Sequence, residues 1–351
     1  MTQIVTIAVD AMGGDSAPEI VLEGMEKTAE LYPQARFLLY GDEAQIMPLL
    51  AKAPALEAKV TVSHTSEVIC AEDKPSQALR RGRQSSMGLA ILAVKEGEAD
   101  VAVSAGNTGA LMALSKFILR TMPGIDRPAL VSPVPTLRGE SVMLDLGANV
   151  ECDAKNLVEF SIMGAAYART VLGLSRPTVG LLNIGVEELK GREAIKSAAD
   201  VLKDASGLPL DFRGFIEGCG IGEGEVDVFV TDGFTGNIAL KTMEGTAKLI
   251  AGLVERAFRS STMSKLGYAF SRSGLQSLKG HLDPNNHNGG VFLGLNGLVV
   301  KSHGGATGAG FATALSTAID MAQYRLIDLI ARDLETIGDM GGVAADGSAV
   351  K

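Results

Sequence analysis

Short runs of apolar and β-branched residues alternate with longer segments of helical periodicity along most of the chain. This alternation is typical of βαβ units, which build a mostly parallel sheet with helices packed on both faces. Several runs are apolar at consecutive positions, as expected for strands buried on both sides. The pattern predicts strands at Ile4–Val9, Arg36–Tyr40, Val60–Ser63, Asp100–Ser104, Ala129–Val134, Ser141–Leu144, Thr178–Asn183, Val226–Thr231 and Leu298–Lys301.

The same pattern predicts one large α/β domain over residues 1–338. It should have three layers and a Rossmann-like, mostly parallel sheet. A chain of 351 residues has room for a domain of this size. Residues 339–351 combine small and polar residues after the last helical pattern, and we expect them to form a flexible tail.

Glycine-rich loops follow six of the predicted strands and hold much of the excess glycine, which amounts to 42 of 351 residues. In a parallel sheet the carboxyl ends of the strands lie along one edge, which is the usual ligand site of open α/β folds. We therefore expect the six loops to converge on one crevice. Their sequences are AMGGDSAPE, SAGNTG, LGANVECD, NIGVEELKG, TDGFTGN and SHGGATG.

The segment from Thr246 to Leu282 breaks the strand–helix rhythm. An apolar stripe at helical spacing, a polar turn and a second apolar stripe predict a protruding amphipathic helical hairpin. Basic residues outnumber acidic ones in it by six to one. Such a hairpin suits an anionic lipid surface or an acidic protein partner, and it also suits a dimer interface with a solvated basic face.

Composition excludes several classes of protein. The net charge of −9 and the few aromatic residues argue against a nucleic-acid partner. Three scattered cysteines (Cys70, Cys152 and Cys219) form neither a disulfide framework nor a zinc motif, which favours a reducing cytoplasm. The first residues lack the pattern of an export signal, and the longest charge-free stretch is too polar to span a membrane.

Three of the glycine-rich turns lead from a predicted strand into a predicted helix, namely SAGNTG, TDGFTGN and SHGGAT. Such turns present backbone N–H groups and the positive end of a helix dipole, so three of them favour a bound anion. Any one turn is equally compatible with a structural role. The dinucleotide and P-loop fingerprints are missing, which weakens both of those interpretations. There is also no G-x-S-x-G elbow and no cysteine in a strand-to-helix nucleophile position, so a covalent acyl-enzyme is not expected.

Two further positions suggest chemistry at the edge of the sheet. Lys190 follows a strand, where its ammonium group can meet a bound phosphate or an oxyanion, although an exposed lysine at a helix start is equally consistent. Asp10 and Asp15 flank a Gly-Gly turn. Carboxylates there can cap the following helix, orient a basic residue or bind a metal, and capping by Asp15 or Ser16 fits best. We predict no metal site and no cofactor.

Six motifs in order give the chain its resemblance to a known family. They are VDAMGGDSAPE, SAGNTGA, LDLGAN, NIGVEELKG, TDGFTGN and LGLNGLVVKSHG. Together they closely resemble the bacterial phosphate acyltransferase family PlsX over nearly the whole chain. The resemblance implies reversible transfer of a fatty acyl group from acyl carrier protein to inorganic phosphate, which gives acyl phosphate for phospholipid synthesis. It also implies a fold like isocitrate dehydrogenase and phosphotransacetylase.

The resemblance further implies a cytoplasmic homodimer that associates peripherally with the membrane and supplies the membrane glycerol-phosphate acyltransferase of the next step. It places Lys190 and Asn237 at the reacting phosphate. Lys265, Arg272 and Lys279 of the hairpin are the predicted contacts to carrier protein or membrane. One departure from the family pattern, Val291 and Phe292 in GGVFLG, points to an altered pocket wall and leaves the acyl-chain preference open.

The inventory of residues agrees with that chemistry. Phosphate is a competent nucleophile and a thioester a good acceptor, so binding, alignment and oxyanion stabilisation suffice without a catalytic triad. Competing readings are a phosphotransacetylase-like enzyme using acyl-coenzyme A, a non-catalytic adaptor for carrier protein and, more remotely, a dehydrogenase. The predicted phosphate- and substrate-binding residues are Asp10, Gly13, Gly14, Ser104, Gly106, Asn107, Thr108, Gly109, Asp232, Gly233, Thr235, Gly236, His303 and Gly304.

Overall fold

A computed structural model describes residues 4–344 except 71, 74, 206 and 284, and it shows one sheet of eleven strands. All nine predicted strands are present, with ends shifted by up to two residues at most boundaries. The order across the sheet is β3-β2-β1-β4-β11-β10-β5-β6-β9-β7-β8. The strands are β1 (Thr6–Asp10), β2 (Arg36–Gly41), β3 (Val60–His64), β4 (Val101–Ser104), β5 (Ala129–Thr136), β6 (Gly139–Leu144), β7 (Thr178–Leu182), β8 (Asp211–Ile216), β9 (Val228–Val230), β10 (Gly290–Leu293) and β11 (Leu298–Lys301).

The sheet is mostly parallel but reverses direction in its middle. Strand β10 is antiparallel to both of its neighbours, β11 and β5, and β5 is antiparallel to β6. The strands from β3 to β11 therefore run one way and those from β6 to β8 run the other way. The expectation that six loops line a single edge is wrong for this reason. The loops after β1, β4 and β11 share one edge, and those after β6, β7 and β9 follow strands of the opposite direction.

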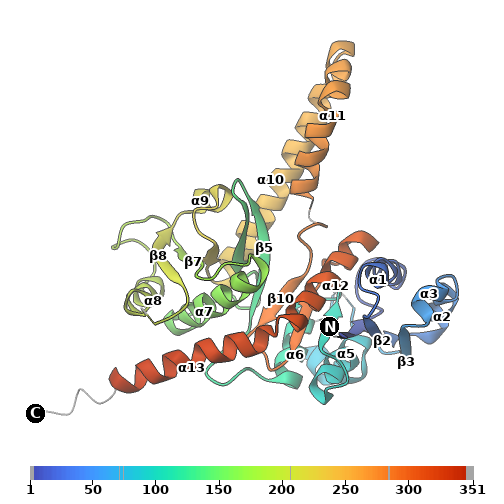
Figure 1. Cartoon of the computed structure of the whole chain (residues 1–351), viewed down its shortest axis with the longest axis horizontal. Coiled ribbons are helices and arrows are strands. Elements are labelled where there is room, and N and C mark those ends of the chain that lie inside the picture. The colour runs from blue at the N-terminus through green and yellow to red at the C-terminus, as the bar shows by residue number, and fades with distance from the viewer. Residues whose placement is uncertain (1–3, 71, 74, 206, 284, 345–351) are drawn as a thin grey trace, which may run out of the picture.

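Helices cover both faces of the sheet and complete the predicted three layers (Figure 1). Buried side chains on one face come from α1 (Glu19–Leu31), α2 (Glu43–Leu50), α3 (Pro54–Glu57), α7 (Ala154–Val171), α8 (Glu193–Asp204), α12 (Gly308–Gln323) and α13 (Leu326–Ala344). The other face is covered by α4 (Pro75–Arg81), α5 (Ser86–Glu96), α6 (Thr108–Leu119), α9 (Gly218–Glu223) and the first part of α10 (Gly233–Arg259). A short 3₁₀ turn spans Gly82–Gln84.

Two strands were not predicted from the sequence. Strand β8 contains Gly214 with φ of +83° and a register shift against β7, so its pattern of side chains is irregular. Strand β10 has only four residues and follows a polar loop. Its Val291 and Phe292 are buried in the sheet and do not line the cavity described below, so the expected change in a pocket wall is wrong.

The predicted helical hairpin is confirmed, but it starts earlier than expected. Helix α10 begins at Gly233, where Asp232 caps it, and continues without interruption to Arg259. Helix α11 (Thr262–Leu282) returns beside it, and the pair projects away from the sheet (Figure 1). No helix among the described residues combines the length and apolar character needed to cross a bilayer.

The end of the chain also differs from expectation. Helix α13 runs from Leu326 through Ala344, so residues 339–344, predicted as part of a flexible tail, are helical. The remainder of that predicted tail, 345–351, lies outside the described residues.

Candidate active site

Three loops from the first half of the sheet meet at its edge through a hydrogen-bonded core. The buried carboxylate of Asp10, at the end of β1, accepts a 2.6 Å hydrogen bond from the hydroxyl of Ser104 at the end of β4. The Ser104 hydroxyl also accepts a bond from the amide of Gly106 at 3.0 Å. Burial raises the pKa of Asp10. Asp10 and Ser104 thus join two loops rather than pointing into open space.

Close backbone approach explains the glycines of these loops. A side chain at Gly13 would place its Cβ 2.6 Å from the Asp10 carboxylate and 2.7 Å from the Gly106 amide nitrogen. Gly14 has φ of +108° and lies against the third loop, where the amide of Asp15 donates to the Gly304 carbonyl at 2.9 Å. The three loops therefore form one packed unit at the ends of β1, β4 and β11.

Helix α6 starts from this unit. Asn107 caps it, accepting a hydrogen bond from the amide of Ala110 at 3.0 Å. Thr108 and Gly109 are in the first turn, where backbone N–H groups have no acceptor within the helix. Both residues line a cavity of about 640 Å³. The start of this helix therefore forms part of the cavity wall.

Lys301, at the end of β11, lines the same cavity and is partly buried. Its ammonium group donates to the carbonyl of Ala105 at 3.3 Å and to the carbonyl of Ser302. Burial lowers the pKa of Lys301 to about 8, although Asp10 acts in the opposite direction. The site thus holds a lysine whose pKa lies well below its ordinary value.

His303 and Lys241 contribute two more nitrogen groups to the cavity wall. The amide of His303 donates to the Asn288 side chain at 2.9 Å, which fixes the loop. Its ring Nε2 lies 3.3 Å from the ammonium of Lys241 on α10. Burial and the nearby Lys241 charge lower the pKa of His303. The ring is therefore neutral near pH 7 and can accept a hydrogen bond from Lys241.

The start of α10 looks similar in sequence but is arranged differently. The Asp232 carboxylate accepts the amide of Thr235 at 2.7 Å, and the Asp232 carbonyl accepts the amide of Gly236 at 2.9 Å. The amide of Gly233 donates to the Asn149 carbonyl at 2.7 Å. Three of the amides expected to cradle phosphate are therefore occupied by the protein itself. The two glycines allow the helix to pack against the turn after β6.

Asn237 connects this helix start to the cavity. Its side-chain amide donates to the carbonyl of Leu146 at 3.1 Å, and it faces Gly147, which has φ of +129°. Within the same turn after β6, the buried carboxylate of Asp145 accepts hydrogen bonds from the amides of Gly147, Ala148 and Asn149. Asn237 lines the cavity.

Lys190 does not line that cavity. Its ammonium pairs with the Glu187 carboxylate at 2.9 Å, and about half of its side-chain surface is exposed. The contact with Glu187 raises the pKa of Lys190. The loop is held beside α10 by Arg192, whose guanidinium lies 3.1 Å from the Asp232 carboxylate. The structure thus brings the Lys190 loop to the helix start without bringing Lys190 into contact with Asn237.

The cavity is lined by two chemically different sets of residues. Nitrogen-bearing groups come from Thr108, Asn237, Lys241, Lys301 and His303. Apolar side chains come from Leu130, Pro133, Val134, Leu240, Met243 and Ile250. Such a cavity can hold an anion beside an extended hydrocarbon group. In the described part of the chain, no cluster of three or more His, Cys, Asp or Glu side chains is arranged to bind a metal ion.

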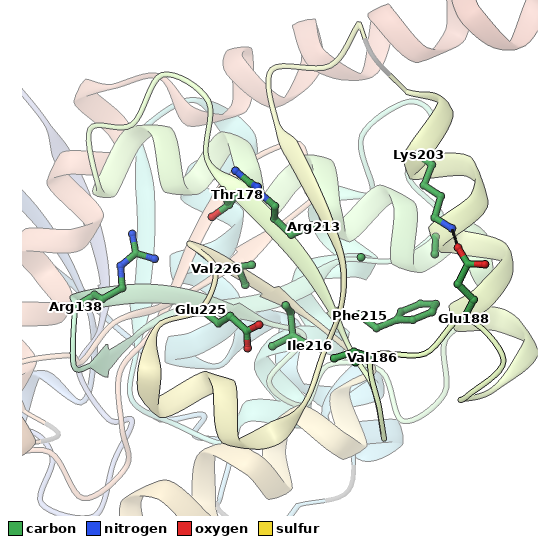
Figure 2. A pocket seen from close by; sticks show the side chains of 12 residues that line it. Arg138, Thr178, Val186, Glu188, Lys203, Arg213, Phe215, Ile216, Glu225 and Val226 are labelled. Atoms are coloured by element: carbon green, nitrogen blue, oxygen red, sulfur yellow. Dashed lines mark hydrogen bonds and ion pairs between the residues drawn. The ribbon is translucent and has the colours of Figure 1, made fainter.

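A second cavity of about 610 Å³ lies beside β7 and β8 and contains none of the predicted site residues (Figure 2). Its charged groups already have partners. Lys203 pairs with Glu188 at 2.8 Å, Arg213 pairs with Asp211 at 2.6 Å, and Arg138 donates to the Gly224 carbonyl at 2.8 Å. These contacts satisfy the cations locally, so this cavity offers less to an anion than the first one.

The hairpin carries an apolar groove of about 800 Å³ between α10 and α11, and Glu244, Ala247 and Ile250 line both this groove and the first cavity. Of the predicted contact residues, Lys265 and Lys279 line the groove and Arg272 does not. Phe270 and Met263 of α11 are largely exposed, at 89% and 76%. The hairpin surface is therefore apolar as well as basic.

Sequence reasoning did not select Lys301, Lys241 or Asp145. Lys301 stands in the quoted motif LGLNGLVVKSHG, as the only charged residue of an otherwise apolar strand. That position at a strand's carboxyl end is the signal that could have revealed it. Lys241 could not be found in this way, because its place depended on α10 starting at Gly233 instead of near residue 246.

Solved structures with the same architecture include two phosphotransacetylases. The chain aligns over 91% of its length with a phosphotransacetylase from Streptococcus pyogenes, with a TM-score of 0.60 and 17% identity, covering 94% of that chain. EutD phosphotransacetylase from Staphylococcus aureus gives a TM-score of 0.58 at 17% identity, covering 92% of this chain and 95% of that one. At this identity the likeness establishes the phosphotransacetylase-like fold.

Sequence comparison then gives the family. The profile of the family described as "Fatty acid synthesis protein" matches residues 5–329, and the chain belongs to this family. A relative named "Phosphate acyltransferase" from Rhodospirillum rubrum is 57% identical over 92% of both chains. One of the same name from Paramagnetospirillum magneticum is 53% identical over 96% of both. The resemblance inferred from the six motifs is confirmed.

Proposed function

We propose that the protein transfers a fatty acyl group reversibly from acyl carrier protein to inorganic phosphate, giving acyl phosphate. Membership of the family and relatives at 53–57% identity over nearly the whole chain support an acyltransferase. The observation that carries the proposal is the cavity lined both by cationic and amide groups and by apolar side chains. The first set suits phosphate and the second suits a fatty chain, so one cavity can hold both reactants.

The reaction needs no acylated residue on the protein. A phosphate oxygen attacks the thioester carbonyl carbon, the new C–O bond forms, and the C–S bond breaks as the tetrahedral intermediate collapses. The sulfur leaves as a thiolate and takes a proton from the site or from water. Because both reactants are held at fixed positions, the rate gain comes from alignment and from stabilisation of the oxyanion.

Asn237 and Lys190 are the residues we propose to act on the reacting groups. The Asn237 side chain lines the cavity and is fixed by its hydrogen bond to Leu146. It is therefore a preorganised donor for the oxyanion or for phosphate. Lys190 has to leave Glu187 to reach the same place, and its loop is already anchored to α10 through Arg192 and Asp232.

The test is to incubate the purified protein with a long-chain acyl carrier protein thioester, with and without phosphate. We expect free thiol and acyl phosphate to form only when phosphate is present. Replacing the donor with short acyl-coenzyme A should give slower turnover, whereas a phosphotransacetylase would prefer that donor. Carrier-protein binding without any phosphate-dependent thiol release would contradict the proposal and identify an adaptor.

The setting of the enzyme belongs to the same proposal. The protein acts as a cytoplasmic homodimer held peripherally at the membrane, where it supplies acyl phosphate to the membrane glycerol-phosphate acyltransferase of the next step. The exposed apolar and basic residues of the hairpin support this arrangement. Flotation with anionic vesicles and light scattering in solution test it. A protein that neither floats nor dimerises would contradict it.

A further inference from the structure

We infer that Lys301 is the principal phosphate-binding cation of the site, an inference that rests on the proposed function. The family resemblance points to Lys190 for this role. Lys190 lies in the loop after β7, whereas Lys301 ends β11 in the opposite half of the sheet. The place of Lys301 in the wall of the cavity, its partial burial and the arrangement of its hydrogen bonds carry the assignment.

The ammonium of Lys301 is held in place but not satisfied. An ammonium group has three N–H donors. Two of them face the carbonyls of Ala105 and Ser302. Among the described residues no carboxylate forms an ion pair with Lys301; the Asp10 carboxylate nearby already accepts bonds from Ser104 and from the amide of Met12. One donor and a full positive charge thus remain for a ligand.

Surrounding groups define an anion as that ligand. Thr108 and Gly109, at the start of α6, line the same cavity and have backbone N–H groups without intrahelical acceptors. Lys241 and His303 line it from α10 and from the loop after β11. A buried cation without a carboxylate partner is costly, and a bound dianion removes that cost. Inorganic phosphate offers a matching charge and several acceptor oxygens.

The contrast with Lys190 strengthens the assignment. Lys190 is half exposed and paired with Glu187, so water and a carboxylate already stabilise its charge. Phosphate has to displace that carboxylate before Lys190 can bind it, whereas Lys301 needs no such exchange. We therefore assign the ground-state binding of phosphate to Lys301 and leave Lys190 to act later, on the charge that develops during transfer.

Phosphate binding should depend on pH through this amine. Burial lowers the pKa of Lys301 to about 8, Asp10 and Asp15 oppose that shift, and Lys241 adds to it. The remaining titratable group beside it, His303, is neutral near pH 7. Above about pH 8 the free protein therefore loses the charge of Lys301. Affinity for phosphate should therefore fall there.

The test compares Lys301→Met and Lys301→Arg with a surface control, Lys95→Met, in the full-length protein. Dissociation constants for inorganic phosphate are measured by ³¹P NMR titration without any acyl donor, and KM and kcat are measured with the acyl thioester present. Loss of a charge-assisted hydrogen bond predicts an increase of about 10- to 100-fold in the Kd and KM for phosphate in Lys301→Met. The KM for the acyl donor should stay close to that of wild type, and Lys95→Met should match wild type throughout.

Lys301→Arg keeps the test decisive even if the methionine variant does not fold. Arginine stays charged, so the rise in phosphate Kd above about pH 8 expected for wild type should be missing in this variant. Unchanged phosphate binding in a folded Lys301→Met protein, identical pH profiles for arginine and wild type, or a wild type that binds no phosphate would each overturn the inference. A wild type that binds phosphate but makes no acyl phosphate contradicts the proposed function instead.

Discussion

Two glycine-rich turns with closely similar sequences, Ser104–Gly109 and Thr231–Gly236, join a strand to a helix in opposite halves of the sheet. At the first, Thr108 and Gly109 line the cavity at the start of α6. Both helices are capped alike, by Asn107 and by Asp232, but at the second turn the first helical amide, of Gly233, is bonded to the Asn149 carbonyl, and the helix packs against the turn after β6. A glycine-rich turn thus predicts a strand–helix connection, while its tertiary neighbours decide whether it can bind a ligand.

The largest expected effect concerns Asn237 and Lys190, the side chains proposed to act on the reaction from the half of the sheet that holds β7 and β9. Asn237→Ala and Lys190→Ala should each lower kcat by about 10²- to 10³-fold, because removing an oxyanion-type donor typically costs that much. Acyl phosphate formation measures it, with circular dichroism to show that folding is intact and Lys95→Ala as control. Turnover like that of wild type in both variants would mean that neither Asn237 nor Lys190 contributes to the reaction.

The next effect concerns Lys301, the partly buried lysine at the end of β11. The unfolded chain keeps the proton of Lys301 up to a higher pH than the folded protein, in which its pKa is about 8. The stability of wild type relative to Lys301→Met should therefore rise with pH, by about 3 kcal/mol between pH 7 and pH 11. Urea unfolding of both proteins across this range measures the difference. A difference that stays constant with pH would show that Lys301 is not desolvated in the folded state.

Packing at the second turn is expected to have a somewhat smaller effect. A Cβ at Gly236 would lie 2.0 Å from the carbonyl oxygen of Asp145, so Gly236→Ala should lower the free energy of unfolding by about 1–3 kcal/mol. Gly245→Ala on the same helix is the matched control, because its Cβ meets nothing within 4 Å. The control should be stabilised by up to about 1 kcal/mol. Equal stabilities for the two variants would remove the packing explanation for these glycines.

The smallest effect concerns the far end of α10 and its partner helix. Reversing Lys265, Arg272 and Lys279 to Glu should weaken binding to carrier protein or to anionic vesicles a few-fold at low salt. The effect should disappear as salt screens exposed charges. Reversing three surface cations outside the hairpin, Lys52, Lys95 and Arg176, provides a control with the same net charge. If both triple variants bind alike, the hairpin charges have no specific partner.

The sequence predicted the layers, nine of the eleven strands and the hairpin, because periodicity reports local burial directly. It could not predict the reversal of the sheet, since the directions of β10 and β5 depend on pairings between residues far apart in the chain, such as Val291 with Val131. The error about a single edge followed from that. Neither the irregular β8 nor the four-residue β10 has a pattern strong enough to be recognised.

For the candidate site, the motifs pointed to loops of which several line the cavity, but not to the contacts that those loops make. The closeness of Asp10, Ser104 and Gly106 follows from neighbouring strands and could be expected. The bond from the Gly233 amide to the Asn149 carbonyl could not, because Asn149 lies in a different loop. The place of Lys301 at the end of a strand is visible in the sequence, but its contacts with the carbonyls of Ala105 and Ser302 are not.

The central claim is that bound phosphate attacks the thioester directly, and the mass of the protein during turnover tests it. Reactions with acyl carrier protein thioester, with phosphate present and withheld, are quenched in acid within one turnover, and the intact protein is weighed. The account predicts an unmodified mass in both conditions, with acyl phosphate formed only when phosphate is present. A protein heavier by one acyl group that loses it on addition of phosphate would contradict the account.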